Sequence, residues 1–145
     1  MLAGGCRCGA VRYRVDLASP PVTYCCHCTD CQTVSGASFA LQLPVSIDGF
    51  EIEGDLAQAT IVTPSGANST HFYCAACLVR IYNINDRRPG FGVVRAGTLD
   101  DSAGLVPRAH IYVRSKQPWI ALPDGVPAYD EVPPLDQWYR LLAST

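Results

Sequence analysis

The stretch STHFYCAACLVRIYNI (residues 69–84) decides how this chain folds. Its two halves alternate apolar and polar residues with a period of two, which predicts two strands that each bury one face. Between them Cys74 and Cys77 form a CxxC pair. Two thiols at the turn of a hairpin can curl around one cation. The stretch therefore predicts a β-hairpin that ends in a pair of metal ligands.

The same alternation recurs along the rest of the chain and predicts further short strands. It is found in AVRYRV (10–15), SFALQL (38–43), ATIVT (59–63), GVVRAG (92–97) and AHIYVR (109–114). Helical signal is confined to TDCQTVSG (29–36), where Gly36 would end the helix, and to LDQWYRLLAS (135–144). The fold class predicted from these patterns is mainly β, in packed antiparallel sheets, with a proline-rich wrap over residues 117–145.

A second cysteine pair, Cys6-x-Cys8, precedes the first of these strands. Residues two apart in extended chain point to the same side, so both sulfurs can face one metal. Together with Cys74 and Cys77 they would complete a closed set of four thiolates, which is typical of a structural zinc site. We expect this zinc to contribute to the folding free energy. The alternatives at these positions are inert thiols or a disulfide.

The densest cluster is CCHCTDC, residues 25–31. Cys26, Cys28 and Cys31 can place three thiolates on one metal, and three protein ligands with an open fourth position are the arrangement of catalytic zinc. A purely structural or vestigial zinc, or iron–sulfur ligation, stays open for this cluster. Cys25 is expected to be a packed thiol, because adjacent side chains in extended chain diverge. His27 is a further candidate for substrate contact.

The length, net charge and composition of the chain limit which classes of protein it can belong to. With 145 residues the chain predicts a single domain that needs no disulfides for stability. A net charge of −2, with the basic residues scattered, argues against nucleic acid as a partner. No secretory signal or membrane-spanning run is found, so a reducing, cytoplasmic location is expected, where clustered cysteines more often bind metal than form disulfides.

Several motifs taken together resemble the glutathione-dependent formaldehyde-activating enzyme (GFA) / centromere protein V-like family. They occur in the family's order between about residues 4 and 119: GGCRCGAVRYRV, CHCTDC followed by SG, FYCAAC, GTLDD, PRAHIYV and KQPW. The resemblance implies a β-tent fold with two zinc ions. It assigns a structural zinc to Cys6, Cys8, Cys74 and Cys77, and an active-site zinc to Cys26, Cys28 and Cys31.

The implied function is that of a carbon–sulfur lyase acting on the adduct of a small thiol such as glutathione and an aldehyde such as formaldehyde. The alternative is a non-catalytic zinc module of the same fold that binds a protein partner. Two residues depart from the family pattern. Leu78 replaces the glycine after the CxxC pair, which suggests an altered turn that still binds metal. Gln32 replaces a basic residue after Cys31, which suggests a different thiol or weak glutathione binding.

Overall fold

The computed structural model describes residues 1–17 and 21–143. The chain forms two compact units. Unit 1 consists of Met1–Ser19 and Leu43–Gly104, and unit 2 of Pro20–Gln42 and Leu105–Thr145. The chain passes from unit 2 back to unit 1 within strand β4 (Ala40–Ser46). The prediction of a single domain remains a prediction.

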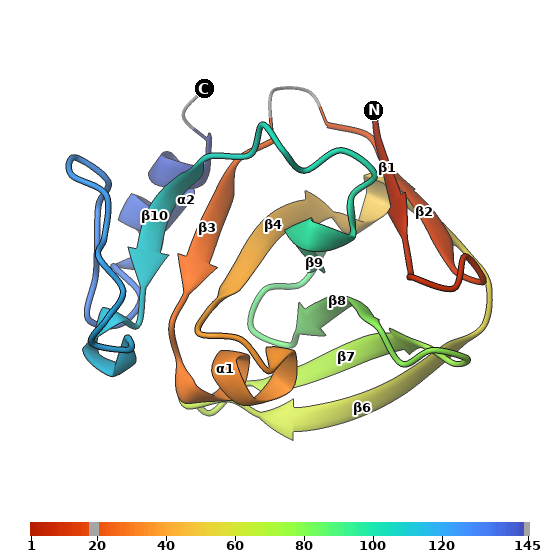
Figure 1. Ribbon diagram of the computed structural model, residues 1–145, viewed down its shortest axis with the longest axis horizontal. Helices are drawn as coiled ribbons and strands as arrows, with labels where there is room; N and C mark the ends of the chain where they lie inside the picture. The colour runs from red at the N-terminus through yellow and green to blue at the C-terminus, as the bar shows by residue number, and fades with distance from the viewer. Residues whose placement is uncertain (18–20, 144–145) are drawn as a thin grey trace. The chain divides into compact units, whose positions relative to one another are not determined.

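Unit 1 is built from antiparallel strands. Short strands pair in the order β1-β2-β5, and longer ones in the order β9-β8-β7-β6 (Figure 1). Their bounds are Leu2–Gly5 (β1), Arg12–Val15 (β2), Phe50–Glu53 (β5), Leu56–Val62 (β6), Asn68–Cys74 (β7), Arg80–Asn85 (β8) and Phe91–Arg95 (β9). The 3-10 turns η1 (Ile47–Gly49) and η2 (Ala96–Thr98) complete the unit. Its buried residues come mainly from β2, β7, β8 and β9, and β2 and β7 show the alternation of buried and more exposed positions that a period of two predicts.

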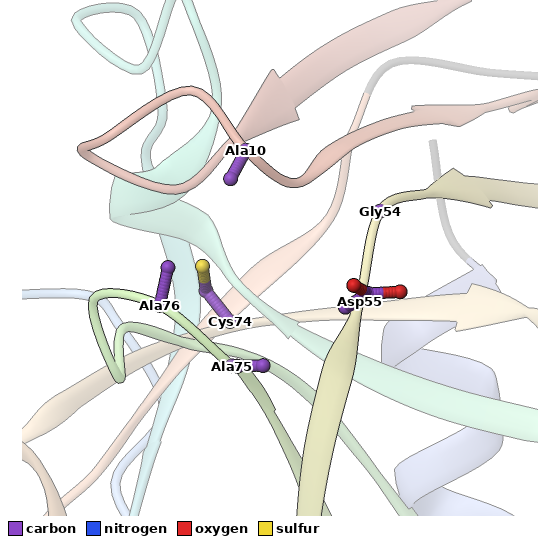
Figure 2. A pocket seen from close by; sticks show the side chains of 6 residues that line it. All are labelled: Ala10, Gly54, Asp55, Cys74, Ala75 and Ala76. Carbon is purple, nitrogen blue, oxygen red and sulfur yellow. The ribbon is translucent and has the colours of Figure 1, made fainter.

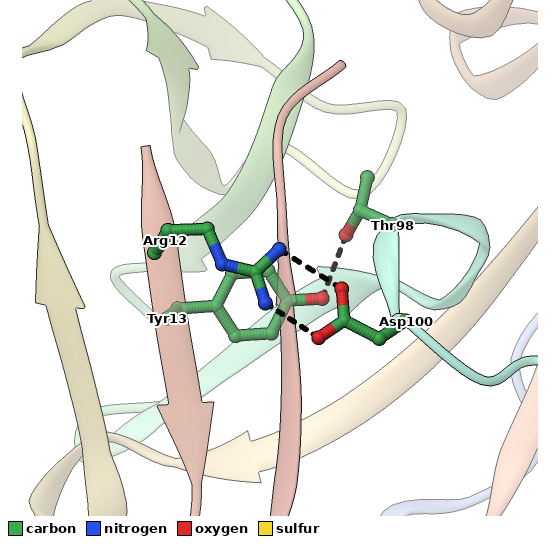
Figure 3. Close-up of polar contacts among 4 residues, drawn as sticks. All are labelled: Arg12, Tyr13, Thr98 and Asp100. Atoms are coloured by element: carbon green, nitrogen blue, oxygen red, sulfur yellow. Dashed lines mark hydrogen bonds and ion pairs between the residues drawn. The ribbon is translucent and has the colours of Figure 1, made fainter. Parts of the chain in front are cut away.

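Two side-chain contacts hold β2 to η2 and to the segment that follows it (Figure 3). Arg12 binds both carboxylate oxygens of Asp100, at 2.9 and 2.5 Å. The Tyr13 hydroxyl lies 2.7 Å from the Thr98 hydroxyl, which itself donates to the Arg95 carbonyl. Because Thr98 has a single hydroxyl proton, Tyr13 is the donor in the first of these bonds. Asp100 therefore has a structural partner, consistent with its place in a turn.

Unit 2 holds the mixed part of the fold. Strand β10 (Pro107–Ile111) runs parallel to β3 (Thr23–Cys26), and β3 pairs antiparallel with the first residues of β4. Helix α1 (Thr29–Ser35) follows β3 directly, the 3-10 turn η3 (Val113–Ser115) follows β10, and α2 (Leu135–Ala143) lies near the end of the chain. The parallel β3–β10 pair corrects the prediction of purely antiparallel sheets. Such a pair needs a long crossover, and short-range sequence patterns do not reveal one.

Helix α2 packs beside β10 (Figure 1) and supplies the centre of the unit 2 core. Trp138 is 1% exposed and meets Tyr24 edge to face, with ring centroids 4.8 Å apart. Cys26 and Cys28 belong to the same buried cluster, and Leu141 and Leu142 of α2 pack against that cluster. The apolar face of α2 therefore forms one wall of the core in which two of the predicted metal ligands sit.

The mainly β prediction is confirmed, and every strand predicted from alternation lies within one to three residues of an observed strand. Both predicted helices are present, although residue 144 lies outside the described residues. Strands β1, β3 and β5 were not predicted. The reason is clearest for β3, whose four residues are all buried, so that no polar face marks it. The β-tent assignment remains a prediction.

Across residues 1–17 and 21–143, no helix is both long and apolar enough to cross a membrane.

Candidate metal centres

The first candidate centre is the four-cysteine cluster of unit 1, which joins two distant parts of the sequence. Cys6 and Cys8 lie in the loop after β1, Cys74 ends β7, and Cys77 lies in the turn before β8. Their sulfur atoms all lie within 4.8 Å of one another. The structure thus brings together the four residues that their spacing had paired.

The sulfur separations test whether a zinc ion fits. Four sulfurs about 2.3 Å from a tetrahedral zinc are about 3.8 Å apart. The Cys8 and Cys74 sulfurs are 3.8 Å apart, and those of Cys6 and Cys8 are 3.4 Å apart. The Val11 N–H also donates to the Cys6 sulfur at 3.2 Å, a contact that suits a thiolate. This arrangement matches a closed tetrathiolate site.

The pKa values of Cys6 and Cys8 are shifted in opposite directions. Burial opposes ionisation of Cys6, but hydrogen bonds from the Val11 N–H and the three neighbouring thiols lower the pKa of Cys6 to about 6. For Cys8 a backbone hydrogen bond at Ala10 lowers the pKa, yet contacts with the Cys6 and Cys77 sulfurs outweigh it and raise the pKa to about 12. Four thiolates at this distance repel one another, so a bound cation is what would let all four ionise.

The CxxC turn uses an unusual residue. Leu78 has a φ of 59°, in the left-handed region that favours glycine. Its N–H donates to the Cys74 carbonyl at 2.9 Å, and the Cys74 N–H donates to the Val79 carbonyl at 2.9 Å. The prediction that the loss of glycine alters this turn is therefore wrong. The backbone keeps the left-handed conformation, and Leu78 occupies it at a steric cost.

A cavity of about 410 Å³ lies against this cluster and is lined by Ala10, Gly54, Asp55, Cys74, Ala75 and Ala76. Figure 2 shows the Cys74 sulfur directed from the end of β7 toward the loop that carries Ala10. The side chains around the cavity are small, and Asp55 is the ionisable group among them besides Cys74.

The second candidate centre is the three-cysteine cluster of unit 2. Cys26 ends β3, Cys28 is the N-cap of α1, and Cys31 lies in the first turn of that helix. Their sulfurs also lie within 4.8 Å of one another. The helix starts here because the Cys28 sulfur accepts the Cys31 N–H at 3.3 Å, and it ends at Gly36, whose φ is 65°.

Access to this cluster is uneven. Cys26 and Cys28 are 5% and 8% exposed, whereas Cys31 is half-buried. Cys31 is thus the most exposed residue of the three. A fourth ligand would reach a metal here most directly from the Cys31 side.

Ionisation of the three thiols is strongly linked. Hydrogen bonds from the thiols of Cys26 and Cys31 lower the pKa of Cys28 to about 3. The contacts of Cys26 with Cys28 and Cys31 raise the pKa of Cys26. One thiolate is therefore easily formed while a second is resisted, which is the behaviour of a ligand set whose full charge requires a metal.

Cys25 and His27, the neighbours of these ligands, face elsewhere. Cys25 is buried outside both clusters, and its burial raises its pKa to about 11. His27 is fully buried, with its Nε2 2.9 Å from Nδ1 of His110 and its ring 5.1 Å from that of Phe39. Burial, and to a lesser degree His110, lowers the pKa of His27 to about 4. The low pKa indicates that the His27 imidazole is neutral, and its contacts show that it packs in the protein interior.

Gln32, where the family often has a basic residue, bonds within the protein. Its amide donates to the His27 carbonyl at 2.8 Å and to the Ser115 carbonyl at 3.0 Å. The Ser115 hydroxyl also donates to the His27 carbonyl, at 2.9 Å. Gln32 and Ser115 thereby hold the CHC segment against η3, and position 32 brings no positive charge.

Gln42 lies beside this cluster and is a residue that the sequence did not single out. The Gln42 amide donates to the Cys31 sulfur at 3.6 Å. Alternation in residues 38–43 places Gln42 on the face opposite Phe39 and Leu41, so the pattern carried no sign that its amide would be buried beside a cysteine.

The chain is similar to known proteins in sequence and in fold. A family model described as glutathione-dependent formaldehyde-activating enzyme matches residues 1–115. A curated protein of Halomonas elongata, named provisionally as a glutathione-dependent formaldehyde-activating enzyme, is 28% identical over 128 residues, covering 84% of this chain and 81% of that protein. The crystal structure of a Rhodobacter sphaeroides protein has a similar fold, with a TM-score of 0.56 and 22% identity over 74% of this chain and 93% of the other.

Proposed function

Because the chain belongs to the glutathione-dependent formaldehyde-activating enzyme family, we propose that it is a zinc-dependent carbon–sulfur lyase-type enzyme. Its substrates would be a small glutathione-like thiol, a formaldehyde-like aldehyde and their adduct. The observation that carries the proposal is the convergence of Cys26, Cys28 and Cys31, of which Cys31 is half-buried and the other two are buried. Cys6, Cys8, Cys74 and Cys77 would hold a second, structural zinc.

The reaction proposed is reversible addition of a thiol to a carbonyl. The sulfur forms a bond to the aldehyde carbon, the carbonyl π bond breaks, and the oxygen ends as a hydroxyl that carries the proton lost by the thiol. A zinc ion held by three thiolates would supply a fourth position that favours a soft sulfur ligand in its deprotonated form. The chain's part is to converge the three sulfurs and to exclude water from two of them.

The identity of the thiol is open to a specific test, because position 32 lacks a positive charge and the Gln32 amide is engaged by backbone carbonyls. Glutathione carries two carboxylates, so binding that depended on a cation at this position would be weak. We propose that thiol selection here relies on the sulfur more than on the carboxylates. A neutral thiol such as 2-mercaptoethanol should then compete with glutathione at comparable concentration.

The first experiment compares the wild type with Cys28→Ser, using Cys25→Ser as the matched control from the same segment. Protein purified without added metal should contain two zinc ions in the wild type and in Cys25→Ser, and one in Cys28→Ser with the fold intact. Exchange NMR should show adduct formation faster than the unaided reaction for the first two proteins only. A wild type that binds a single zinc would defeat the proposal.

The burial of Cys26 and Cys28 favours one alternative, a non-catalytic zinc module that binds a protein partner. In that case both zinc ions would be present. Thiol would then leave the spectrum of a cobalt-substituted protein unchanged, and adduct formation would proceed at the unaided rate.

A further inference from the structure

We propose that Gln42 is a positioning residue of the three-cysteine centre, whose side-chain amide holds the thiolate of Cys31 in place. The inference rests on the proposed function, because it assumes that this centre binds a metal. It goes beyond that function by assigning a role to a residue outside the cysteine motif.

The geometry comes from the pairing of two neighbouring strands. Gln42 lies on β4 opposite Tyr24 of β3. Tyr24 is two residues before Cys26, the candidate ligand at the end of β3. From β4 the Gln42 Nε2 reaches the Cys31 sulfur at 3.6 Å, within the range of an N–H···S hydrogen bond. Gln42 is only 5% exposed, so its amide bonds inside the protein.

The chemistry of an amide suits this position. A buried amide is costly unless its N–H groups find acceptors, and a thiolate is a strong acceptor for a neutral donor. An apolar side chain of similar length would fill the same space without that cost. A donor is therefore what distinguishes glutamine from methionine at this site.

Cys31 is also the ligand that most needs a fixed orientation. Cys28 accepts the Cys31 backbone N–H and is buried, whereas Cys31 is half-buried, so a substrate thiol would approach the centre most directly from the Cys31 side. The Gln42 N–H withdraws charge from the Cys31 sulfur, which leaves a bound metal more electron-poor and better able to hold a fourth ligand. Outer hydrogen bonds of this kind commonly change metal affinity by about 10- to 100-fold.

The test replaces the amide and keeps the shape. Gln42→Met is compared with Gln58→Met, which alters an exposed glutamine on β6. Zinc affinity is measured by competition with a chromophoric chelator. The cobalt spectrum of the second site is obtained by subtracting the spectrum of Cys28→Ser. Gln42→Leu is the second variant, should Gln42→Met fail to fold by circular dichroism.

We expect second-site zinc affinity to fall about 10- to 100-fold in the Gln42 variant and the sulfur-to-cobalt charge-transfer band to move to longer wavelength. Gln58→Met and the four-cysteine site should be unchanged. Two ions in the wild type, with unaltered affinity and band position in the Gln42 variant, would overturn this inference alone. A single ion in the wild type would overturn the proposed function and the inference with it.

Discussion

At the scale of single residues, the segments that carry the two cysteine clusters each use a left-handed backbone position, filled by a different residue. Gly36 ends α1 with a φ of 65° and meets no steric barrier there. Leu78 adopts nearly the same backbone, at 59°, with a Cβ that crowds its own carbonyl. Because Leu78 is 69% exposed, little packing compensates for this strain.

Leu78→Gly should therefore stabilise the zinc-loaded protein. Relief of the left-handed strain contributes about 1–2 kcal/mol, and the greater freedom of glycine in the unfolded chain offsets about 0.5–1 kcal/mol of it. The net gain of about 0.5–1 kcal/mol would be measured by urea unfolding at fixed zinc. Leu78→Ala is the control, since alanine keeps the strain and should change stability little. A less stable glycine variant would show that the Leu78 side chain has a packing role.

The sequence could identify the ligands but not the residues that support them. Cysteine spacing predicted both clusters, because short pairs leave few ways to reach one metal. Leu78 was expected to alter its turn, since propensity says nothing about whether the surrounding hydrogen bonds can hold a strained backbone. Gln42 carried no signal, because its role depends on a partner from another element.

At the scale of elements, the three-cysteine centre depends on a helix far away in the sequence. Helix α2 places Trp138 against Tyr24 on β3, and β3 ends at the ligand Cys26. The Trp138 Nε1 has no hydrogen-bond partner within the described part of the chain. Trp138 therefore stabilises unit 2 through packing alone. Replacing it with alanine or with phenylalanine removes different amounts of that packing.

Trp138→Ala should destabilise unit 2 by about 3–5 kcal/mol, because it opens a large cavity beside Cys26 and Cys28. We expect zinc content to fall toward one ion per chain, since the four-cysteine cluster belongs to unit 1. Trp138→Phe keeps a ring at the site and loses no hydrogen bond, so it should cost about 1–2 kcal/mol and retain both ions. Denaturant unfolding and metal analysis measure both effects. Two retained ions in the alanine variant would contradict the dependence of the cluster on α2.

Element prediction succeeded for most strands but missed β3, which is buried on both faces, and the short strands β1 and β5. Strands β7 and β8 alternate and were located to within one residue. Strand β3 is buried on both faces, and its residues TYCC resemble a ligand loop more than a strand. The parallel partner β10 lies more than eighty residues later in the chain, so the mixed sheet could not be read from local sequence.

At the scale of the whole molecule, each cysteine cluster lies within one unit. The four-cysteine cluster joins the first segment of unit 1 to the second, with Cys8 and Cys74 separated by 66 positions in the chain. A metal there closes a long loop and should contribute folding free energy to unit 1. The three-cysteine cluster closes only a short loop and should contribute much less.

Chelation should therefore remove the two metals in distinct steps. A graded chelator titration is expected to release the three-cysteine ion first, with the circular dichroism of the sheets retained. Release of the second ion should coincide with loss of sheet signal, and Cys74→Ser should behave like the fully chelated protein. Cys25→Ser, which alters no ligand, should follow the wild type. Simultaneous release of both ions would contradict the assignment of independent centres.

The interleaving of the two units also sets an order for biosynthesis. A ribosome that has synthesised the chain through Cys77 has delivered all four ligands of the first centre, so a nascent chain could already capture that metal. Cys26, Cys28 and Cys31 emerge earlier still, but their cover on β10 and α2 is translated about 80 and 105 residues later. Until then these three thiols are exposed to cellular oxidants and competing metals, so the arrival of α2 is the step that protects the three-cysteine cluster.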